Sequence, residues 1–364
     1  MLASNKLKMT YRIGLFIVGL IIVLHTSCKN DVLEPKSPLL SLPTSPLEYA
    51  NVNYPNHIQQ AIATLDNTPI TNPITNDGAS LGRVLFYDKS LSMNNKVSCA
   101  SCHRAADGFS DRRIKSEGFE DKKTRRNSMP LLNVRFYKSG KMFWDERTNT
   151  LEEQVLLPIQ DHIEMGMDLG QLITKLEQIS YYPTLFEKAF GSEQITPERI
   201  AKGLAQFIRA MITYRSKYDQ VLEGAATFTA TEQNGKRVYD LFGGQQGCQG
   251  CHGGGFLDVA SYHLQMGQTA SKTGAVHLDD LGLYEVSQMD SDSFRFKVST
   301  LRNIEMTAPY LHDGSVADLL TLFSLPHHNF GMTRTEINDL IEFLKTLTDY
   351  EIIQDERFLD PFEE

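Results

Sequence analysis

Two copies of the pentapeptide Cys-x-x-Cys-His carry the most specific chemistry in this 364-residue sequence, at residues 99–103 and 248–252. This pentapeptide is the attachment site of c-type haem, because two thiols at this spacing can each form a thioether with one porphyrin while the adjacent imidazole ligates its iron. The motifs therefore predict two covalently bound haem c groups and redox chemistry. The predicted attachment and ligand residues are Cys99, Cys102, His103, Cys248, Cys251 and His252.

Zinc is the main alternative for two Cys-x-x-Cys pairs. The pairs of a zinc ribbon usually stand within about 20 residues of each other. Here the two pairs lie much farther apart, and a histidine follows each pair directly. A disulfide inside either motif would leave that histidine without a role. We therefore favour haem over zinc and over disulfides.

The N-terminus has the features of a secretory signal. Three cations precede an apolar run at residues 13–24, which is too short to span a bilayer. The run leads to Cys28, the one cysteine outside the haem motifs, in a context that resembles a bacterial lipobox, with His25 where such signals usually carry Leu. We predict a signal peptide with a lipobox at residues 1–28, and a periplasmic protein anchored to the membrane by lipid on Cys28. Cleavage without lipid attachment is the alternative.

The composition is that of an ordinary globular protein. Hydrophobic residues make up 41% of the chain, which is enough for the cores of about two domains. The net charge is −9, and removal of the signal takes away only cations, so the surface argues against nucleic-acid binding. Residues 29–55 are rich in Pro and Ser and predict an extended linker.

Beyond the linker, the readable elements are helices. Thr196, Pro197 and Glu198 are typical of a helix start, as cap, first-turn proline and acidic first turn. Capping-box patterns start at Thr229 and Thr333. Apolar residues follow the first and the last of these starts at helical spacing: Ile200, Leu204, Ile208, Met211 and Ile212, then Ile337, Leu340, Ile341, Leu344 and Leu347. We predict a mainly α protein with two cytochrome c-like haem domains in tandem, at residues 56–220 and 221–364.

An ordered set of short motifs surrounds the haem sites. They are Leu-Gly-Arg-x-Leu-Phe-Tyr-Asp at 81–88, Leu-Ser at 91–92, Arg-Asn at 126–127, Phe-Trp-Asp at 143–145, Leu-Glu-Glu-Gln at 151–154, Pro at 158, Glu-Met-Gly at 164–166, Leu-Arg-Asn at 301–303 and Thr-Ala-Pro-Tyr-Leu-His-Asp-Gly at 307–314. In this order they resemble the bacterial di-haem cytochrome c peroxidase family, which includes the related di-haem enzyme that matures methylamine dehydrogenase. The resemblance covers nearly the whole folded chain.

The resemblance implies a division of labour between the two haems. The N-terminal haem, with His103 as proximal ligand, would be the low-potential peroxide site, and the C-terminal haem, with His252, a high-potential electron store. Glu164 and Gln154 match the distal pair of the family. A carboxylate can take a proton from one peroxide oxygen and return it to the other, whereas an amide can only orient the substrate. The alternative for Glu164 is a solvated acid on a helix.

The resemblance assigns further roles around the haems. Trp144, the single tryptophan, would lie between the haems and couple them electronically, with a core packing residue as the alternative. Asn127, Thr307 and Pro309 match positions that bind a calcium ion through oxygen ligands in relatives. His312 matches a residue near a haem propionate.

The sequence departs from the family pattern at two distal positions. Many of these peroxidases carry a second histidine 16 residues after the proximal one, where it caps the oxidised active iron; here that residue is Phe119. Phenylalanine cannot ligate iron, so we predict an open or water-filled first site in the oxidised protein. The distal ligand of the second haem is usually Met or Tyr, 14 residues beyond the position of His312, where this chain has Pro326. The nearby candidates for this ligand are His327, His328 and Met332.

The function implied is a di-haem peroxidase that reduces hydrogen peroxide to water with electrons from a small periplasmic cytochrome or cupredoxin. One alternative is oxidation of an organic or protein substrate through a high-valent haem state. The other alternative is a non-catalytic di-haem electron carrier. The resemblance also implies a homodimer.

Overall fold

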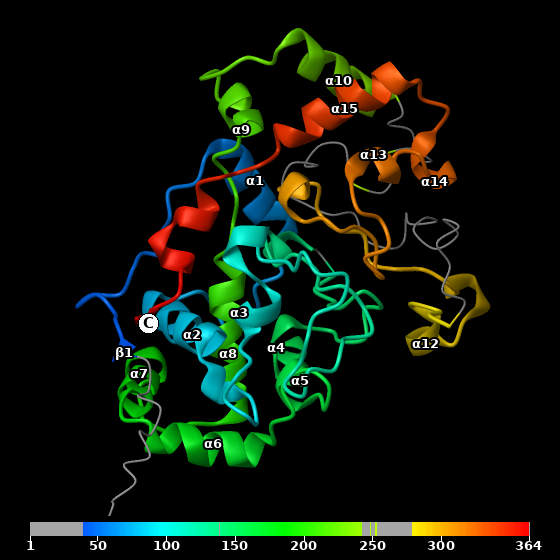
Figure 1. Cartoon of the computed structure of the whole chain (residues 1–364). Helices are drawn as coiled ribbons and strands as arrows, with labels where there is room; N and C mark the ends of the chain where they lie inside the picture. The colour runs from blue at the N-terminus through cyan, green and yellow to red at the C-terminus, as the bar shows by residue number, and fades with distance from the viewer. Residues whose placement is uncertain (1–38, 138, 242–247, 249–251, 253–278, 364) are drawn as a thin grey trace, which may run out of the picture. The chain divides into compact units, whose positions relative to one another are not determined.

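The structure, a computed structural model, describes residues 39–137, 139–241, 248, 252 and 279–363. Helices dominate this part of the chain, which confirms the mainly α expectation (Figure 1). The described α-helices are α1 (Asn56–Leu65), α2 (Asn76–Tyr87), α3 (Cys99–Cys102), α4 (Leu151–Gln154), α5 (Leu156–Gln160), α6 (Leu169–Gln178), α7 (Tyr181–Phe190), α8 (Pro197–Arg209), α9 (Lys217–Leu222), α10 (Ala230–Leu241), α12 (Tyr284–Ser287), α13 (Leu319–Leu322), α14 (Pro326–Asn329) and α15 (Arg334–Lys345). Two short antiparallel strands, β1 (Leu39–Leu40) and β2 (Phe362–Glu363), pair with each other. Single 3₁₀ turns include Lys89–Leu91, Ala105–Asp107, Val134–Phe136, Asp290–Asp292, Ile304–Met306, Ile352–Gln354 and Glu356–Phe358.

The three helix starts expected from the sequence are confirmed. The hydroxyl of Thr196 caps α8. Thr333 and Glu336 form the expected capping box at α15, with both reciprocal hydrogen bonds in place. Thr229 and Glu232 make the same pair of hydrogen bonds at α10. Capping is local chemistry, so these starts follow from residues only three positions apart.

Helix α8 ends earlier than its apolar spacing predicted. It stops at Arg209, and Met211 and Ile212 lie beyond it although both are buried. Asn133 accounts for the difference, because its backbone N–H donates to the carbonyl of Met211 (2.9 Å) and its side-chain oxygen accepts from the N–H of Thr213 (3.0 Å). These bonds satisfy backbone groups that a longer helix would otherwise pair internally.

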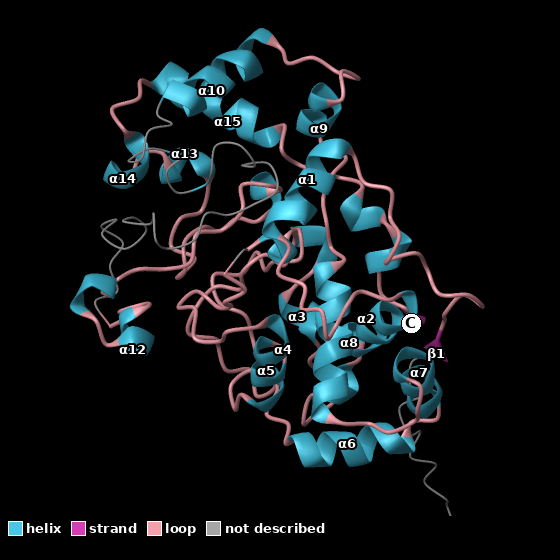
Figure 2. Cartoon of the chain, turned by 180° about the vertical axis from the view of Figure 1, so that it is seen from behind, coloured by secondary structure: helices cyan, strands magenta, loops and turns pink. Residues whose placement is uncertain are grey.

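The buried apolar side chains form two main clusters, each built on a pair of packed helices. In the first, α2 lies beside α8, and in the second, α10 lies beside α15 (Figures 1 and 2). Cys99 packs against the first cluster and Cys248 against the second. The chain returns to the first cluster near its end, through Ile352 and Phe358. Each haem motif is thus joined to its own core, while the domain boundary near residue 220 stays a prediction.

The second half of the expected linker packs onto the folded body, in contrast to an extended tether. β1 pairs with β2, and Tyr49 is 2% exposed. The Tyr49 ring contacts the rings of Phe207 and Phe358 edge-on, and its hydroxyl donates to the carbonyl of Arg357 (2.6 Å). Burial of an aromatic ring with its hydroxyl paired explains why this segment is ordered against the core.

The signal peptide and lipobox expected at residues 1–28 lie outside the described residues. Within the described ranges, no helix is both long enough and apolar enough to cross a membrane.

Candidate active site

The first Cys-x-x-Cys-His motif begins with one helical turn, α3, that is capped by its own serines. Ser98 and Ser101 form a capping box at its start. Because residues three positions apart share a helix face, the turn presents both thiols on the same side. Burial raises the pKa of Cys99 to about 12 and that of Cys102 to about 11. The motif thus offers two adjacent thiols to one porphyrin.

His103 follows the turn with one ring nitrogen already engaged. Its Nδ1 lies 3.2 Å from the carbonyl oxygen of Phe109. Burial lowers the pKa of His103, so the ring is held in its neutral form. An Nδ1–H that donates to this carbonyl leaves Nε2 as the iron ligand and fixes the orientation of the ring. The residues of the first motif therefore fit a covalently bound haem.

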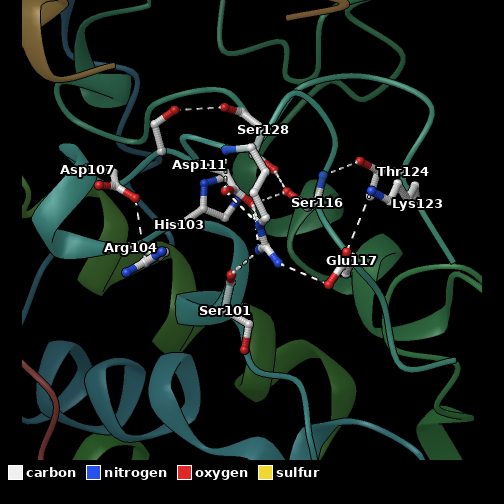
Figure 3. A network of polar contacts seen from close by, with 12 residues as sticks. Ser101, His103, Arg104, Asp107, Asp111, Ser116, Glu117, Lys123, Thr124 and Ser128 are labelled. Atoms are coloured by element: carbon white, nitrogen blue, oxygen red, sulfur yellow. Dashed lines mark hydrogen bonds and ion pairs between the residues drawn. The ribbon is translucent and has the colours of Figure 1, made fainter. Parts of the chain in front are cut away.

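A polar network fixes the chain after the first motif (Figure 3). The Arg113 guanidinium binds the carboxylate of Asp111 through Nη2 (2.7 Å) and Nε (3.0 Å), and Nη2 also donates to the carbonyl of Ser101 in α3 (2.9 Å). The hydroxyl of Ser116 donates to Asp111 Oδ2 (2.6 Å) and lies 2.8 Å from the hydroxyl of Ser128. The loop after the motif is thereby tied back to the motif helix.

Glu164 lies on a turn at residues 161–166, close to the first motif. Burial raises the pKa of Glu164 to about 7, and the charge of Asp161 adds to this effect while Arg147 opposes it. The charge of Glu164 in turn contributes to the raised pKa values of Cys99 and Cys102, after burial. The structure therefore brings this carboxyl group into electrostatic reach of both attachment cysteines. A desolvated carboxyl group of this kind can both accept and return a proton near neutral pH.

Gln154 is the last residue of α4 and is half-buried. Glu152 anchors this short helix, because its carboxylate accepts hydrogen bonds from Arg209 in α8 (2.6 and 2.9 Å). Among the described residues, no hydrogen bond joins the Gln154 amide to the Glu164 carboxyl group. The role of Gln154 as the second distal residue stays a prediction.

Trp144 is hydrogen-bonded to two segments from different halves of the chain, one at Asn127 and the other at Lys297. Its indole Nε1 donates to the carbonyl of Asn127 (2.8 Å), and its own carbonyl accepts from the backbone N–H of Lys297 (2.7 Å). The segment of Lys297 continues to Ser299, whose carbonyl lies 3.1 Å from His252 Nδ1. The half-buried indole is therefore bonded to the first half of the chain, while the main chain of Trp144 is bonded to the segment that supports His252.

The second haem motif is described only in part. Cys251 lies outside the described residues, whereas Cys248 and His252 are both half-buried. Burial lowers the pKa of His252 to about 4, and the hydrogen bond to Ser299 opposes this shift only in part. The neutral ring with Nδ1 at a carbonyl repeats the arrangement of His103 and fits a proximal ligand.

The three candidates for the distal ligand of the second haem lie on and just after α14. Pro326 is the first residue of this helix, and its side chain has no atom that can ligate iron, so the family position itself supplies no ligand. His328 is half-buried, and Met332 is 6% exposed within the second cluster. The side chain of His327 lies outside the described part of the structure. The ligand stays a prediction among these three residues.

His312 is part of a polar cluster with residues from both halves of the chain. Its ring is stacked on that of Phe296, with centroids 3.7 Å apart, and its Nε2 lies 3.9 Å from Asp280. Asp280 also binds Arg126, which pairs with Asp145 as well. Burial lowers the pKa of His312. Its expected place beside a haem propionate stays a prediction.

The residues expected to bind calcium make other contacts. The Asn127 amide nitrogen donates to the carbonyl of Arg113 (3.0 Å), and the Thr307 hydroxyl donates to the carbonyl of Ile304 (3.2 Å). Pro309 is buried. Within the described ranges, no three His, Cys, Asp or Glu side chains form a group that could hold a metal ion. Calcium binding stays a prediction.

Sequence reasoning missed two groups next to the site. The first is the ring of Phe119, which packs against the backbone of Gly166. The only sequence signal for this contact is a glycine two positions after Glu164. The second is Lys297, which is 7% exposed with Nζ 3.9 Å from the ring centroid of Tyr137. Burial lowers the pKa of Lys297 to about 8. A lysine between the apolar residues of Phe-Lys-Val at 296–298 is the corresponding signal in the sequence.

Comparison with known proteins places these motifs in a family. Residues 76–227 match the family model described as di-haem cytochrome c peroxidase. The chain is 34% identical to a cytochrome c551 peroxidase of Nitrosomonas europaea, over 76% of this chain and 81% of the relative. It is 31% identical to the methylamine utilization protein MauG of Methylophilus methylotrophus, over 77% of this chain and 84% of the relative. A crystal structure of a MauG-like protein associated with microbial copper homeostasis has a TM-score of 0.74 and 30% identity, covering 85% of this chain and 99% of that one.

Proposed function

Because the chain belongs to the di-haem cytochrome c peroxidase family, we propose that it reduces hydrogen peroxide to water with electrons from a small redox protein. The family implies two c-type haems. The overall reaction joins one hydrogen peroxide molecule with two electrons and two protons to give two water molecules. The observation that carries the proposal is the desolvated carboxyl group of Glu164, which lies within electrostatic reach of Cys99 and Cys102.

Each haem would be held by its own motif, the first by Cys99, Cys102 and His103. When bound, the haems supply one-electron iron centres, and the first supplies the metal at which peroxide reacts. The chain supplies the proton chemistry. The ionised carboxylate of Glu164 takes a proton from one oxygen of the peroxide and returns it to the other oxygen as the O–O bond breaks. The amide of Gln154 can orient peroxide or water but cannot transfer a proton.

The raised pKa of Glu164 supports this role. A general base works best when its pKa lies near the operating pH, and burial brings this carboxyl group to about 7. A solvated helix acid, the alternative for this residue, would keep the pKa of an exposed glutamate. The second motif, with His252 and its carbonyl partner Ser299, fits a second haem, and the family resemblance is what assigns electron storage to it.

The direct test follows both haems by stopped-flow spectroscopy. The holoprotein is reduced by one electron without air and mixed with one equivalent of hydrogen peroxide. Rapid oxidation of the reduced haem, with water as product, is expected for a peroxidase. No reaction with peroxide would overturn the proposal and leave the di-haem electron carrier as the function.

A second candidate uses the same reaction with peroxide to oxidise another organic molecule or a protein. The relatives named MauG favour it, as does the placement of Trp144, whose hydrogen bonds to Asn127 and Lys297 join both halves of the chain. Turnover of peroxide with only a reduced cytochrome or cupredoxin present supports the peroxidase. A long-lived oxidised species that decays only when a further substrate is added would support the second candidate.

The proposed setting is the periplasm, with Cys28 carrying a lipid anchor and the protein acting as a homodimer. Globomycin treatment tests the anchor, because it blocks lipoprotein signal cleavage and would retain residues 1–27 on the chain. Release of the protein in soluble form, without lipid and with residues 1–27 removed, would contradict the anchor. Sedimentation of the holoprotein tests the dimer.

A further inference from the structure

One loop contacts both the first haem motif and the turn that carries Glu164. It runs from residue 116 to residue 124 and is visible in part in Figure 3. At its start, the hydroxyl of Ser116 donates to Asp111 (2.6 Å), which also binds Arg113. Arg113 donates to the carbonyl of Ser101 within the motif helix (2.9 Å). The beginning of the loop is therefore tied to the helix that attaches the haem.

The middle of the same loop is in backbone contact with the Glu164 turn. The N–H of Phe119 donates to the carbonyl of Glu164 (2.9 Å). A Cβ atom at Gly118 would overlap the carbonyl oxygen of Ile163, so only glycine permits this approach. Two consecutive loop residues, Gly118 and Phe119, therefore contact the main chain at Glu164.

The Phe119 ring packs against Gly166, the last residue of the turn. A Cβ atom at Gly166 would lie 2.5 Å from this ring, and the φ of +64° at Gly166 is itself one that glycine adopts without strain. On the other side, the amide of Asn94 donates to the carbonyl of Phe119. The ring and both of its backbone polar groups are therefore fixed, and Phe119 occupies a defined place beside Glu164.

Other contacts leave the turn little freedom to move independently of the loop. The carboxylate of Asp161 accepts from the N–H groups of Ile163 (2.7 Å) and Glu164 (3.1 Å). The N–H of Met93, just before the first motif, donates to the carbonyl of Met165 (2.9 Å). The turn is therefore hydrogen-bonded both internally and to the segment before the first motif, and the loop connects it to α3.

We propose that Gly118 and Phe119 are positioning residues that hold Glu164 at a fixed distance from the first haem motif. This inference rests on the proposed function, because it assigns the support of the carboxyl group that handles the peroxide protons. A movable loop would place Glu164 only part of the time. A fixed one keeps it in place in the oxidised protein, so no rearrangement precedes the reaction with peroxide. Misplacement of a catalytic group by about 1 Å can cost about 100-fold in rate.

The test compares four loop variants with a control and a reference, all as holoproteins. Gly118→Ala pushes the turn away, Phe119→Ala removes the ring, and Phe119→Leu and Phe119→Met keep an apolar group on Gly166. Gly170→Ala in α6 is the control, because a Cβ there would meet only the side chain of Asp168. Glu164→Gln is the reference for complete loss of the carboxyl group.

Two quantities are measured on each variant across a pH series on both sides of 7. One is the second-order rate constant with hydrogen peroxide. The other is the infrared band of the protonated Glu164 carboxyl group, identified by its absence from Glu164→Gln, which reports the pKa without turnover. The charged groups around Glu164 are Asp161 and Arg147, and none of the variants changes either residue.

Gly118→Ala and Phe119→Ala are expected to react about 10- to 100-fold more slowly, with a lower pKa of Glu164 as water reaches its carboxyl group. Phe119→Leu and Phe119→Met are expected to keep most of the rate, and Gly170→Ala all of it. If Gly118→Ala does not fold, Phe119→Ala still tests the positioning role. This variant removes atoms without adding any, so it introduces no steric clash.

Unchanged rates and an unchanged band midpoint in both Gly118→Ala and Phe119→Ala, with Glu164→Gln slow, would overturn the inference and leave the proposed function intact. A wild-type rate in Glu164→Gln would instead overturn the catalytic role of Glu164. The infrared midpoint of Phe119→Ala would then decide the positioning role alone.

Discussion

The backbone N–H of Lys297 donates a hydrogen bond of 2.7 Å to the carbonyl of Trp144. On its other side, the indole of Trp144 donates to Asn127 (2.8 Å). Two residues beyond Lys297, the carbonyl of Ser299 holds the imidazole of His252. Trp144 thus joins the segment that supports the second proximal ligand to the first half of the chain.

Trp144→Phe is expected to slow electron transfer between the haems. Phenylalanine is harder to oxidise, and it cannot donate to Asn127, so both the electronic coupling and the anchoring are reduced. Flash reduction of the second haem, followed by the spectrum of the first, measures this step directly. Haem content should match the wild type, because neither attachment motif changes. Equal transfer rates in the two proteins would assign Trp144 to packing alone.

Glu164→Gln is expected to lower the rate constant with hydrogen peroxide by about 10²- to 10⁴-fold, the usual contribution of a general acid–base group. In the wild type, Glu164 must be ionised to accept a proton, so the rate should fall as the pH drops through about 7. The variant should lose this pH dependence. Glu164→Asp is the matched control, since it retains a carboxyl group. A wild-type pH profile in Glu164→Gln would show that another group titrates.

The first haem is expected to be open in the oxidised protein, because Phe119 cannot ligate iron and is fixed against Gly166. Electron paramagnetic resonance of the oxidised holoprotein should show a high-spin signal, or the signal of a water-bound haem. Cyanide should bind without prior reduction. Phe119→His tests the position itself, and a new low-spin signal there would show that a side chain at this place can reach the iron. Only six-coordinate low-spin haem in the wild type would contradict the prediction.

The sequence predicted those parts of the site that depend on contiguous residues. Haem attachment requires Cys and His side by side, and the Thr333 capping box needs only residues three positions apart. The contact of Phe119 with Gly166 and the bond from Lys297 to Trp144 join distant segments, so no spacing or periodicity encodes them. The same reason explains the early end of α8, because Asn133 approaches from another part of the chain.

A buried ion pair between Arg302 and Asp219 is expected to determine much of the stability of the chain. Arg302 and Asp219 are 0% and 1% exposed and share two hydrogen bonds, and Asp219 also accepts from His57 (2.7 Å). Asp219→Asn leaves the charge of Arg302 buried without its counter-ion, which typically costs about 3–5 kcal/mol. Urea unfolding of the holoprotein measures this loss. Glu342→Gln, which breaks an exposed pair with Lys345, should cost at most about 1 kcal/mol.

The same pair predicts how the holoprotein responds to acid. Burial acts to raise the pKa of Asp219, but the charge and hydrogen bonds of Arg302 outweigh it and hold the pKa below the usual 3.8. Below about pH 4 the unfolded chain therefore binds a proton that the folded chain does not. The stabilisation is complete above this pH and is lost progressively as the pH falls toward the folded pKa. Unfolding measured at pH 6 and at pH 3 should show a larger difference between wild type and Asp219→Asn at pH 6. An equal difference at both pH values would mean that the pair does not contribute through the charge of Asp219.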